Sequence, residues 1–150
     1  MTHFLGTHHN RLDAKGRVSV PAPFRAALRV NGDASLILRP SHKHPCIEAW
    51  PAAIFRQLAT PLERLDLFSE AHDDLAATVY ADAWPVDTDK EGRIILPETL
   101  AVHARLAENV VFMGLGLIFQ IWEPAAAERR RAEARERARA GGFTLPGAAA

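Results

Sequence analysis

The residues with the clearest chemical potential form a short basic segment near the N-terminus, Asp13-Ala14-Lys15-Gly16-Arg17. Lys15 supplies a compact positive charge, and Arg17 supplies a planar guanidinium whose fork matches O6 and N7 of guanine. Gly16 lies between them and allows the backbone to approach a phosphate closely. Because phosphate contacts give affinity and base contacts give specificity, these residue types at this spacing predict binding to DNA.

The same segment returns 76 residues later as Asp89-Lys90-Glu91-Gly92-Arg93. At this offset, four of the thirteen positions from 13 to 25 are identical, and both copies continue through three strand-like residues into a proline. A repeat of this kind indicates two structural units built alike. Glu91 stands where the first copy has Lys15, so the second copy is expected to contact phosphates weakly or to serve mainly as the other half of the fold.

The aspartate that opens each copy needs a different role, because phosphates repel a carboxylate. Asp13 and Asp89 are expected to stabilise the turn or to orient the arginine four residues later through a charge-assisted hydrogen bond. The alternative is that each Asp–Arg pair is only a surface ion pair, which contributes little to stability.

The first copy continues through Val18-Ser19-Val20 into Pro21-Ala22-Pro23-Phe24-Arg25. This order, Asp-x-Lys-Gly-Arg, a β-rich tripeptide and then Pro-x-x-Phe-Arg, closely resembles the MraZ family of bacterial transcriptional regulators. The likeness extends from Phe4 to Glu123, about four-fifths of the chain. The second copy departs from the pattern at Ala101, which replaces the arginine of Pro-x-x-Phe-Arg.

The resemblance implies an α+β, β-rich fold, in which two tandem βαββ-type SpoVT-AbrB repeats form a swapped-hairpin β-barrel with a helical linker and a C-terminal helix. It also implies a ring-like homo-oligomer that binds double-stranded DNA at short, G-rich direct repeats in the promoter of its own division and cell-wall gene cluster. The DNA-binding residues would be Lys15, Gly16, Arg17, Arg25, Lys90 and Arg93. Asp13 and Asp89 would orient the two turns.

A length of 150 residues permits one domain or two small domains that share a core. A repeat unit of about 45 residues buries too little surface to fold alone, so the units are expected to fuse, to oligomerise or both. Cys46 is the single cysteine, which excludes an internal disulfide and suits a reducing compartment. We find no signal-peptide pattern and no apolar run long enough to span a membrane. We therefore expect a soluble, cytoplasmic, nucleoid-associated protein without a cofactor.

The formal net charge is zero, but the charges are unevenly distributed. Residues 1–43 hold seven Lys and Arg against two Asp and Glu, whereas residues 44–124 hold five against thirteen. Residues 125–150 hold six arginines against three glutamates. Segments of opposite sign are typical of a protein with a nucleic-acid-binding face, and here the positive segment contains the first copy of the repeat.

Turn and helix signals place the expected elements in two units. Asp13 and Gly16 favour a turn between two strands. The first unit is expected to contain strands at 4–12, 17–20, 36–38 and 46–50 with a helix at 21–30, and the second strands at 93–96, 110–113 and 117–122 with a helix at 97–104. We expect domains at 7–54 and 83–125, a helical linker at 55–82 and a charged helical or disordered tail at 126–150.

The segment between the units is expected to be helical. Thr60-Pro61-Leu62-Glu63 has a capping-box pattern, and Ser69 opens a further helix with acidic residues in its first turn. Trp84-Pro85 is expected to end this helical segment. The apolar stripe of the second helix comprises Leu75, Ala76, Val79 and Tyr80.

The tail after Pro124 is rich in alanine, arginine and glutamate and strongly favours a helix. Charged pairs are expected for Glu128 with Arg131 and for Glu133 with Arg137. Before Phe143 the tail offers only alanines for burial, so we expect it to extend into solvent.

Other kinds of site are less favoured. His42, His44 and Cys46 alternate along the chain, but Pro45 interrupts any strand there, so no metal site is expected. The three tryptophans, Trp50, Trp84 and Trp122, are expected to pack in the core or at an interface.

The competing functions come from different classes. The main alternative is an AbrB-fold protein-interaction module with vestigial DNA binding, which the zero net charge and the altered second copy favour. An AbrB-type antitoxin is a third possibility, although such proteins usually carry one copy and a toxin-binding tail. An enzyme is not expected, because no nucleophile–base set or metal cage converges in either half.

Overall fold

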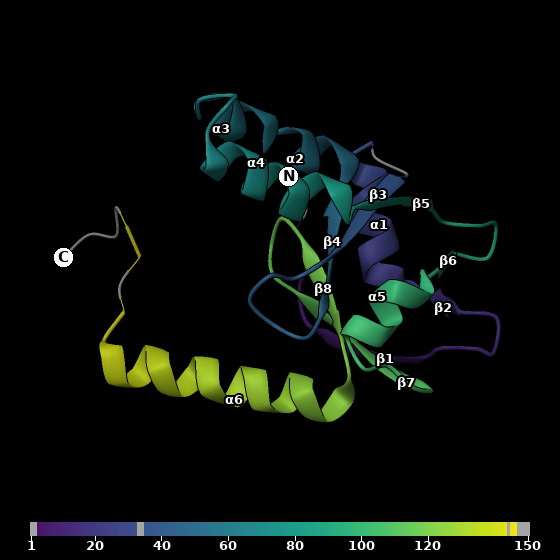
Figure 1. The fold of residues 1–150 in the computed structure, drawn as a ribbon. Coiled ribbons are helices and arrows are strands. Elements are labelled where there is room, and N and C mark those ends of the chain that lie inside the picture. The colour runs from purple at the N-terminus through teal and green to yellow at the C-terminus, as the bar shows by residue number, and fades with distance from the viewer. Residues whose placement is uncertain (1–2, 33–34, 144, 147–150) are drawn as a thin grey trace.

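The strands of the two repeats interleave in one sheet, as a computed structural model of the chain shows for residues 3–32, 35–143 and 145–146 (Figure 1). The six-stranded sheet has the order β1-β7-β8-β4-β3-β5, and β2 pairs separately with β6. The strands are β1 (Thr7–Arg11), β2 (Arg17–Ser19), β3 (Ser35–Pro40), β4 (Ile47–Pro51), β5 (Trp84–Asp87), β6 (Arg93–Ile95), β7 (Asn109–Gly114) and β8 (Phe119–Trp122). The helices are α1 (Ala22–Val30), α2 (Ala52–Arg56), α3 (Ala59–Glu63), α4 (Glu70–Ala76), the π-helix η1 (Ala77–Ala81), α5 (Glu98–His103) and α6 (Pro124–Gly141).

Each repeat gives its opening strand to the other repeat. β1 pairs antiparallel with β7, so that His9 lies opposite Val111, and β5 pairs antiparallel with β3, so that Leu36 lies opposite Val86. The central pair, β4 with β8, joins the two halves. The predicted α+β fold with two interleaved repeats is therefore confirmed, and neither repeat completes its sheet without the other.

The core lies between the six-stranded sheet, the β2–β6 ladder and helices α1 and α5. Phe24 of α1 and its repeat equivalent Leu100 of α5 are both buried, as the apolar spacing predicts. Phe4 packs edge-on against Phe24 and Phe119, with ring centroids 5.3 and 5.0 Å apart. Such edge-to-face pairs are favourable beyond the area that they bury. The core thus draws its large side chains from both repeats.

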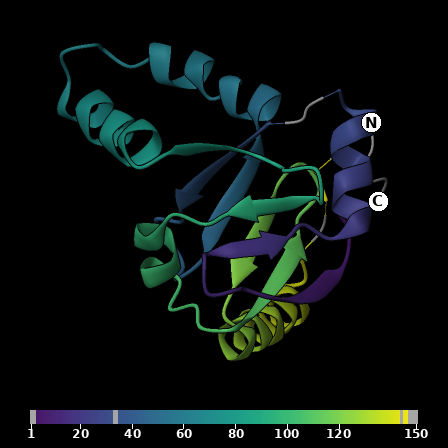
Figure 2. The same ribbon diagram turned by 90° about the vertical axis from the view of Figure 1, so that its right-hand side faces the viewer.

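Residues 52–81 form a helical hairpin that projects from the body (Figures 1 and 2). Ser69 begins α4 and accepts a hydrogen bond from the backbone N–H of His72, as expected. The capping-box prediction was wrong, because Thr60 lies inside α3 and Leu58 occupies the N-cap. Trp84 does not simply end the helical segment but begins strand β5, where it is 45% exposed.

A buried arginine of the sheet connects the sheet to this hairpin. Arg39 of β3 is 3% exposed, and its Nη1 donates to Oε1 of Glu48 at 2.7 Å. Its Nη2 donates to the carbonyl oxygen of Thr78 in η1 at 3.1 Å, and Nε1 of Trp50 donates to the same Glu48 oxygen. The bond to Thr78 joins the base of the hairpin to β3, and loss of Glu48 would leave the Arg39 charge buried without its partner.

The first turn of α6 packs against β7, in the half of the sheet away from β3 and β5. Glu123 caps it by accepting from the N–H groups of Ala125 and Ala126, and these bonds hold the pKa of the Glu123 carboxyl below its usual value. Ala127 is 1% exposed in a second cluster with Cys46, Val111, Met113 and Trp122. The expectation that the whole tail extends into solvent was therefore wrong for its first turn.

The rest of α6 follows the prediction more closely. Glu128 and Arg131 form the expected ion pair at 2.9 Å. Among the described residues, Arg139 pairs with Glu136 at 3.3 Å, whereas Glu133 and Arg137 form no ion pair. Within the same residues, no helix has the length and apolar character needed to cross a bilayer.

Replacing Ala127 by aspartate should lower the free energy of unfolding by at least about 2 kcal/mol, because a carboxylate would be buried without a partner. The matched control is Ala132→Asp, at an exposed position of the same helix, which should cost under about 1 kcal/mol. Urea unfolding of both variants measures the difference. Equal stability of the two variants would contradict the packing of Ala127.

Candidate nucleic-acid interface

The first basic turn is organised by Asp13. Its Oδ1 accepts from the backbone N–H groups of Lys15 at 2.9 Å and Arg17 at 2.8 Å, and its Oδ2 accepts from Nε of Arg17 at 2.7 Å. The bonds from Arg17 and Lys15 hold the pKa of the Asp13 carboxyl below its usual value. Asp13 therefore binds both the backbone of the turn and the guanidinium of Arg17.

The second turn repeats this arrangement atom for atom. Oδ1 of Asp89 accepts from the N–H groups of Glu91 and Arg93, each at 2.9 Å, and Oδ2 accepts from Nε of Arg93 at 2.9 Å. The pKa of the Asp89 carboxyl is lowered by the same bonds, with the Arg93 N–H contributing most. Two sequences that share only three residues in this stretch of five thus give one geometry.

The glycines make both turns possible. Gly16 has φ +80° and Gly92 has φ +76°, which are backbone conformations that a side chain disfavours. Each glycine carbonyl also reaches the other repeat. The Gly16 oxygen accepts from the N–H of Leu96 at 2.8 Å, and the Gly92 oxygen accepts from the N–H of Val20 at 2.9 Å.

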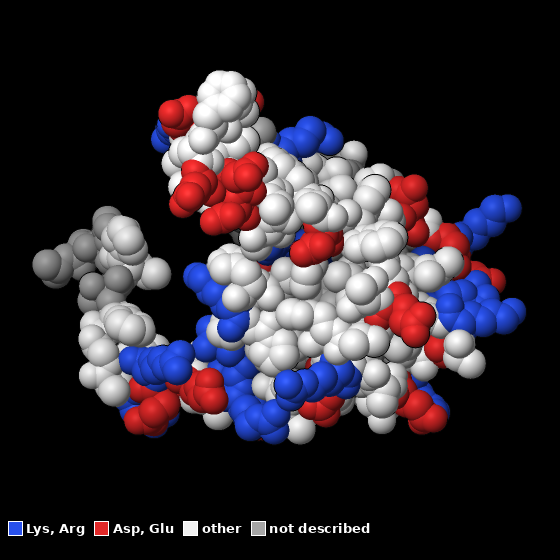
Figure 3. All heavy atoms as spheres, in the orientation of Figure 1, with Lys and Arg blue, Asp and Glu red and all other residues white. Residues whose placement is uncertain are grey.

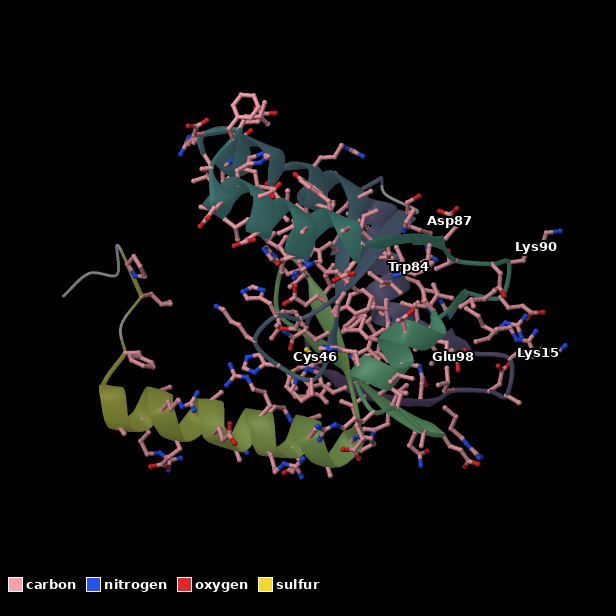
Figure 4. All side chains as sticks on the ribbon, in the orientation of Figure 1. Lys15, Cys46, Trp84, Asp87, Lys90 and Glu98 are labelled. Atoms are coloured by element: carbon pink, nitrogen blue, oxygen red, sulfur yellow. The ribbon has the colours of Figure 1, made fainter. Side chains whose placement is uncertain are left out.

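These reciprocal bonds extend the β2–β6 ladder, in which Val18 lies opposite Ile94. The two turns are therefore held side by side at one end of the molecule (Figures 1 and 2). Lys15 and Lys90 project outward from this end (Figure 4). The structure thus brings the predicted residues of both copies together on a single surface, which we call the paired-turn surface: residues 13–17 and 89–93 with Arg25.

Arg25 does not accompany the turn that precedes it in the sequence. A Cβ built on Gly92 would lie 2.5 Å from Cδ of Arg25, so this side chain lies directly over the second turn. With Arg29, Leu28 and Thr88 it lines a surface depression of about 350 Å³ beside that turn. Arg25 therefore adds its positive charge where the second copy has lost the lysine of the first.

Arg29 is a candidate that the sequence interpretation did not include. It follows Arg25 by one helical turn in α1 and borders the same depression. The i, i+4 spacing of two arginines was a detectable signal, because such residues share one helix face. The location of that face beside the second turn depends on the strand exchange.

The arginines of the two turns differ in their ion pairs. Nη2 of Arg93 contacts Oε2 of Glu91 at 2.5 Å, and the two carboxylates beside it raise the Arg93 pKa, Asp89 most strongly. In the described part of the chain, the terminal nitrogens of Arg17 form no ion pair, and its side chain is 31% exposed. Arg17 is thus oriented by Asp13 through Nε while both Nη groups remain available to a ligand.

Charge is unevenly distributed over the molecule. Lys and Arg side chains lie at the paired-turn end and along α6, interspersed there with acidic side chains, whereas Asp and Glu side chains predominate on the helical hairpin (Figure 3). α6 runs away from the end that carries the turns (Figures 1 and 2). The two basic regions of one chain therefore face different directions.

The remaining candidates do not form a site. Within the described residues, no three His, Cys, Asp or Glu side chains are grouped so as to hold a metal ion. Cys46 is buried, and burial raises the pKa of its thiol to about 12 (Figure 4). Desolvation lowers the pKa of His44, whose ring lies 5.7 Å from that of Trp122. Cys46 and His44 therefore pack within the protein, and the candidate site consists of the charged side chains at the turns.

Comparison with known proteins gives the family of the chain. A family model described as "MraZ protein, putative antitoxin-like" matches residues 3–77 and 79–140. A protein of Gluconacetobacter diazotrophicus named "Transcriptional regulator MraZ" is 69% identical over 93% of this chain and 90% of its own length. Proteins of the same name from Gluconobacter oxydans and Azorhizobium caulinodans are 64% and 41% identical, each over 93% of this chain and 87% and 88% of their own lengths. The chain belongs to the MraZ family.

Proposed function

We propose that this chain is a transcriptional regulator, not an enzyme, and that it binds double-stranded DNA through the paired-turn surface. The observation that carries the proposal is the presence of two Asp-organised basic turns, held side by side by reciprocal backbone hydrogen bonds. The names of the relatives, which designate transcriptional regulators, support the same role. We place its action in the cytoplasm, at the nucleoid.

In this proposal some side chains contact phosphates and others contact bases. Lys15, Lys90 and Arg25 neutralise phosphates, and Gly16 allows the backbone to approach one. Arg17 is oriented by Asp13 and presents two Nη groups, which suits a bidentate contact with guanine O6 and N7. Two-stranded β elements can enter the major groove, so the ends of the β2–β6 ladder can bring these groups to the bases. Arg93 plays a weaker part because Glu91 already occupies one of its Nη groups.

The target we propose is a set of short, G-rich direct repeats in the promoter of the chain's own division and cell-wall gene cluster. Two features support a target of this kind. The guanidinium of Arg17 favours guanine, and the two turns differ in charge, which gives each protomer a direction along DNA. Direct repeats match copies that all point the same way, whereas a perfect palindrome matches a symmetric reader.

A protein-interaction module with vestigial DNA binding is the second candidate. The Glu91–Arg93 ion pair favours it, because this contact partly neutralises the second turn. A salt-titrated mobility shift on the chain's own promoter separates the two functions. A steep loss of binding with salt, together with preference over random DNA, supports the regulator, and no shift at low salt supports the interaction module.

Replacing Arg17 by alanine should remove most specific binding, and replacing Arg93 should be milder. A bidentate arginine–base contact contributes about 1–3 kcal/mol, and an oligomer multiplies the loss over its copies. Fluorescence anisotropy on one promoter fragment compares both variants, with far-UV circular dichroism as the control for folding. An equal or larger loss at Arg93 would reverse the proposed ranking.

Single substitutions in each turn can test the effect of the charge difference between the two turns. Glu91→Lys should release Arg93 and raise the net charge of the turn by two, so DNA affinity should rise at least about tenfold at low salt, with a steeper salt dependence. Lys15→Glu is the matched change in the first turn and should lower affinity. Titrations at two salt concentrations give both slopes. If Glu91→Lys leaves the affinity and the slope unchanged, the second turn does not face DNA.

We also propose that the chain forms a homo-oligomer, and a ring in particular. Strands β1 and β5 are the outer strands of the six-stranded sheet, and exposed edges favour association. Trp84 on β5 is 45% exposed, which suits an interface better than the core. Multi-angle light scattering at micromolar concentration should report several times the mass of one chain. A monomer would refute both the ring and the contribution of avidity to DNA binding.

A further inference from the structure

The helical hairpin carries an apolar groove of about 320 Å³ between α3 and the α4–η1 segment. Its lining residues are Leu58, Pro61, Leu62, Leu65, Leu75 and Val79. At the tip of the hairpin, Leu67 and Phe68 are 65% and 92% exposed. An apolar groove with exposed apolar neighbours marks a surface that binds another molecule.

The surroundings of this groove are acidic. Residues 52–82 contain six Asp and Glu against two arginines, and all six carboxylate residues are exposed. Figure 3 shows acidic side chains gathered on this projecting part of the molecule. The occupant of the groove should therefore combine apolar side chains with positive charge.

The end of α6 has this combination. We define the C-terminal arm as residues 132–143 together with Leu145. Phe143 and Leu145 are 72% and 79% exposed. Gly142 ends the helix with φ +56°, and a Cβ built on Gly141 would lie 2.7 Å from Cε1 of Phe143, so the aromatic ring rests on the helix end. Exposed arginines, Arg135, Arg137 and Arg139, precede it.

We propose that the hairpin groove of one chain binds the C-terminal arm of a second copy. Phe143 and Leu145 would enter the apolar groove, and the arginines of α6 would face the carboxylates of the hairpin. Within a single chain neither surface is satisfied, since Phe143 is 72% exposed and Leu75 in the groove is 45% exposed. An aromatic side chain that enters an apolar pocket is a common energetic centre of protein interfaces.

The geometry of α6 suits this contact. An 18-residue helix is about 27 Å long, and the C-terminal end of α6 lies beyond the sheet (Figure 1). The arm and the groove are different surfaces, so each copy can give its arm to one neighbour and receive the arm of another. Such heterologous contacts generate closed rings when the rotation between copies allows it. This inference rests on the proposed self-association and identifies the surfaces that would produce it.

Disulfide trapping between two differently substituted full-length chains tests the contact directly. One chain carries Phe143→Cys and the other carries Leu75→Cys, and the native Cys46 is silent because it is buried with a thiol pKa of about 12. Mixing and mild oxidation should give a covalent heterodimer. The matched control replaces Leu75→Cys by Val102→Cys, which lies on α5 and is 69% exposed, and should give none.

Each other result of this experiment overturns the contact. Equal trapping with Val102→Cys would show random collision, and no trapping in an oligomer would place the interface elsewhere. A single chain carrying both Phe143→Cys and Leu75→Cys that closes its disulfide internally would show that the arm serves its own groove. A wild-type monomer by light scattering would instead refute the proposed oligomer itself, so the two failures are distinguishable.

Side-chain variants supply an independent readout. Phe143→Ala should weaken self-association at least tenfold in sedimentation equilibrium, whereas Leu5→Ala, at a position 72% exposed in the body, should not. Reversing the charge of Arg135, Arg137 and Arg139 to glutamate should also weaken it. Changing Glu70, Asp73 and Asp74 to lysine in the same chain should restore association. Unchanged association in Phe143→Ala, or no restoration by the second set of changes, contradicts the proposed pairing.

Discussion

The exchange of opening strands between the two repeats is the constraint on which the rest of the structure depends. Because β1 pairs with β7 and β5 pairs with β3, each half of the sheet is closed by a strand from the other half. The same exchange brings β2 beside β6, where the carbonyls of Gly16 and Gly92 accept hydrogen bonds from the opposite repeat. The two basic turns are therefore adjacent as a consequence of the fold, and a change in sheet pairing would separate them.

The two turns differ in charge but have the same backbone shape. The shape depends on the aspartate and the glycine, which both copies retain, since Asp13 and Asp89 make the same three hydrogen bonds. The charge depends on positions that tolerate change, such as Glu91. Arg25 from the first repeat lies over Gly92 of the second and offsets part of the acidic replacement. Each turn therefore has its own electrostatic character within one common backbone.

Local signals in the sequence predicted much of this arrangement, and each failure has its own physical cause. The turn at Asp13–Gly16 and the buried face of α1 follow from residue type and spacing, which are local properties. The placement of Arg25 beside the second turn could not be predicted, because spacing does not report which strands pair. Ala127 was assigned to solvent although it is buried, since alanine suits both environments in a helix. Thr60 matched a capping pattern, but a cap also requires a non-helical backbone, which the sequence does not specify.

The separation of charge over the molecule gives the two basic regions different roles. The paired-turn surface lies at one end, and α6 extends away from it, so both cannot lie on the same short stretch of DNA within one protomer (Figures 1 and 3). In the proposed pairing of copies, the arginines of α6 face the acidic hairpin of another copy. If they act there, they contribute to DNA binding through assembly, because each added copy brings another pair of turns to successive sites. Repeated turns, an acidic hairpin and a basic arm then form one system in which DNA affinity depends on contacts made far from the DNA.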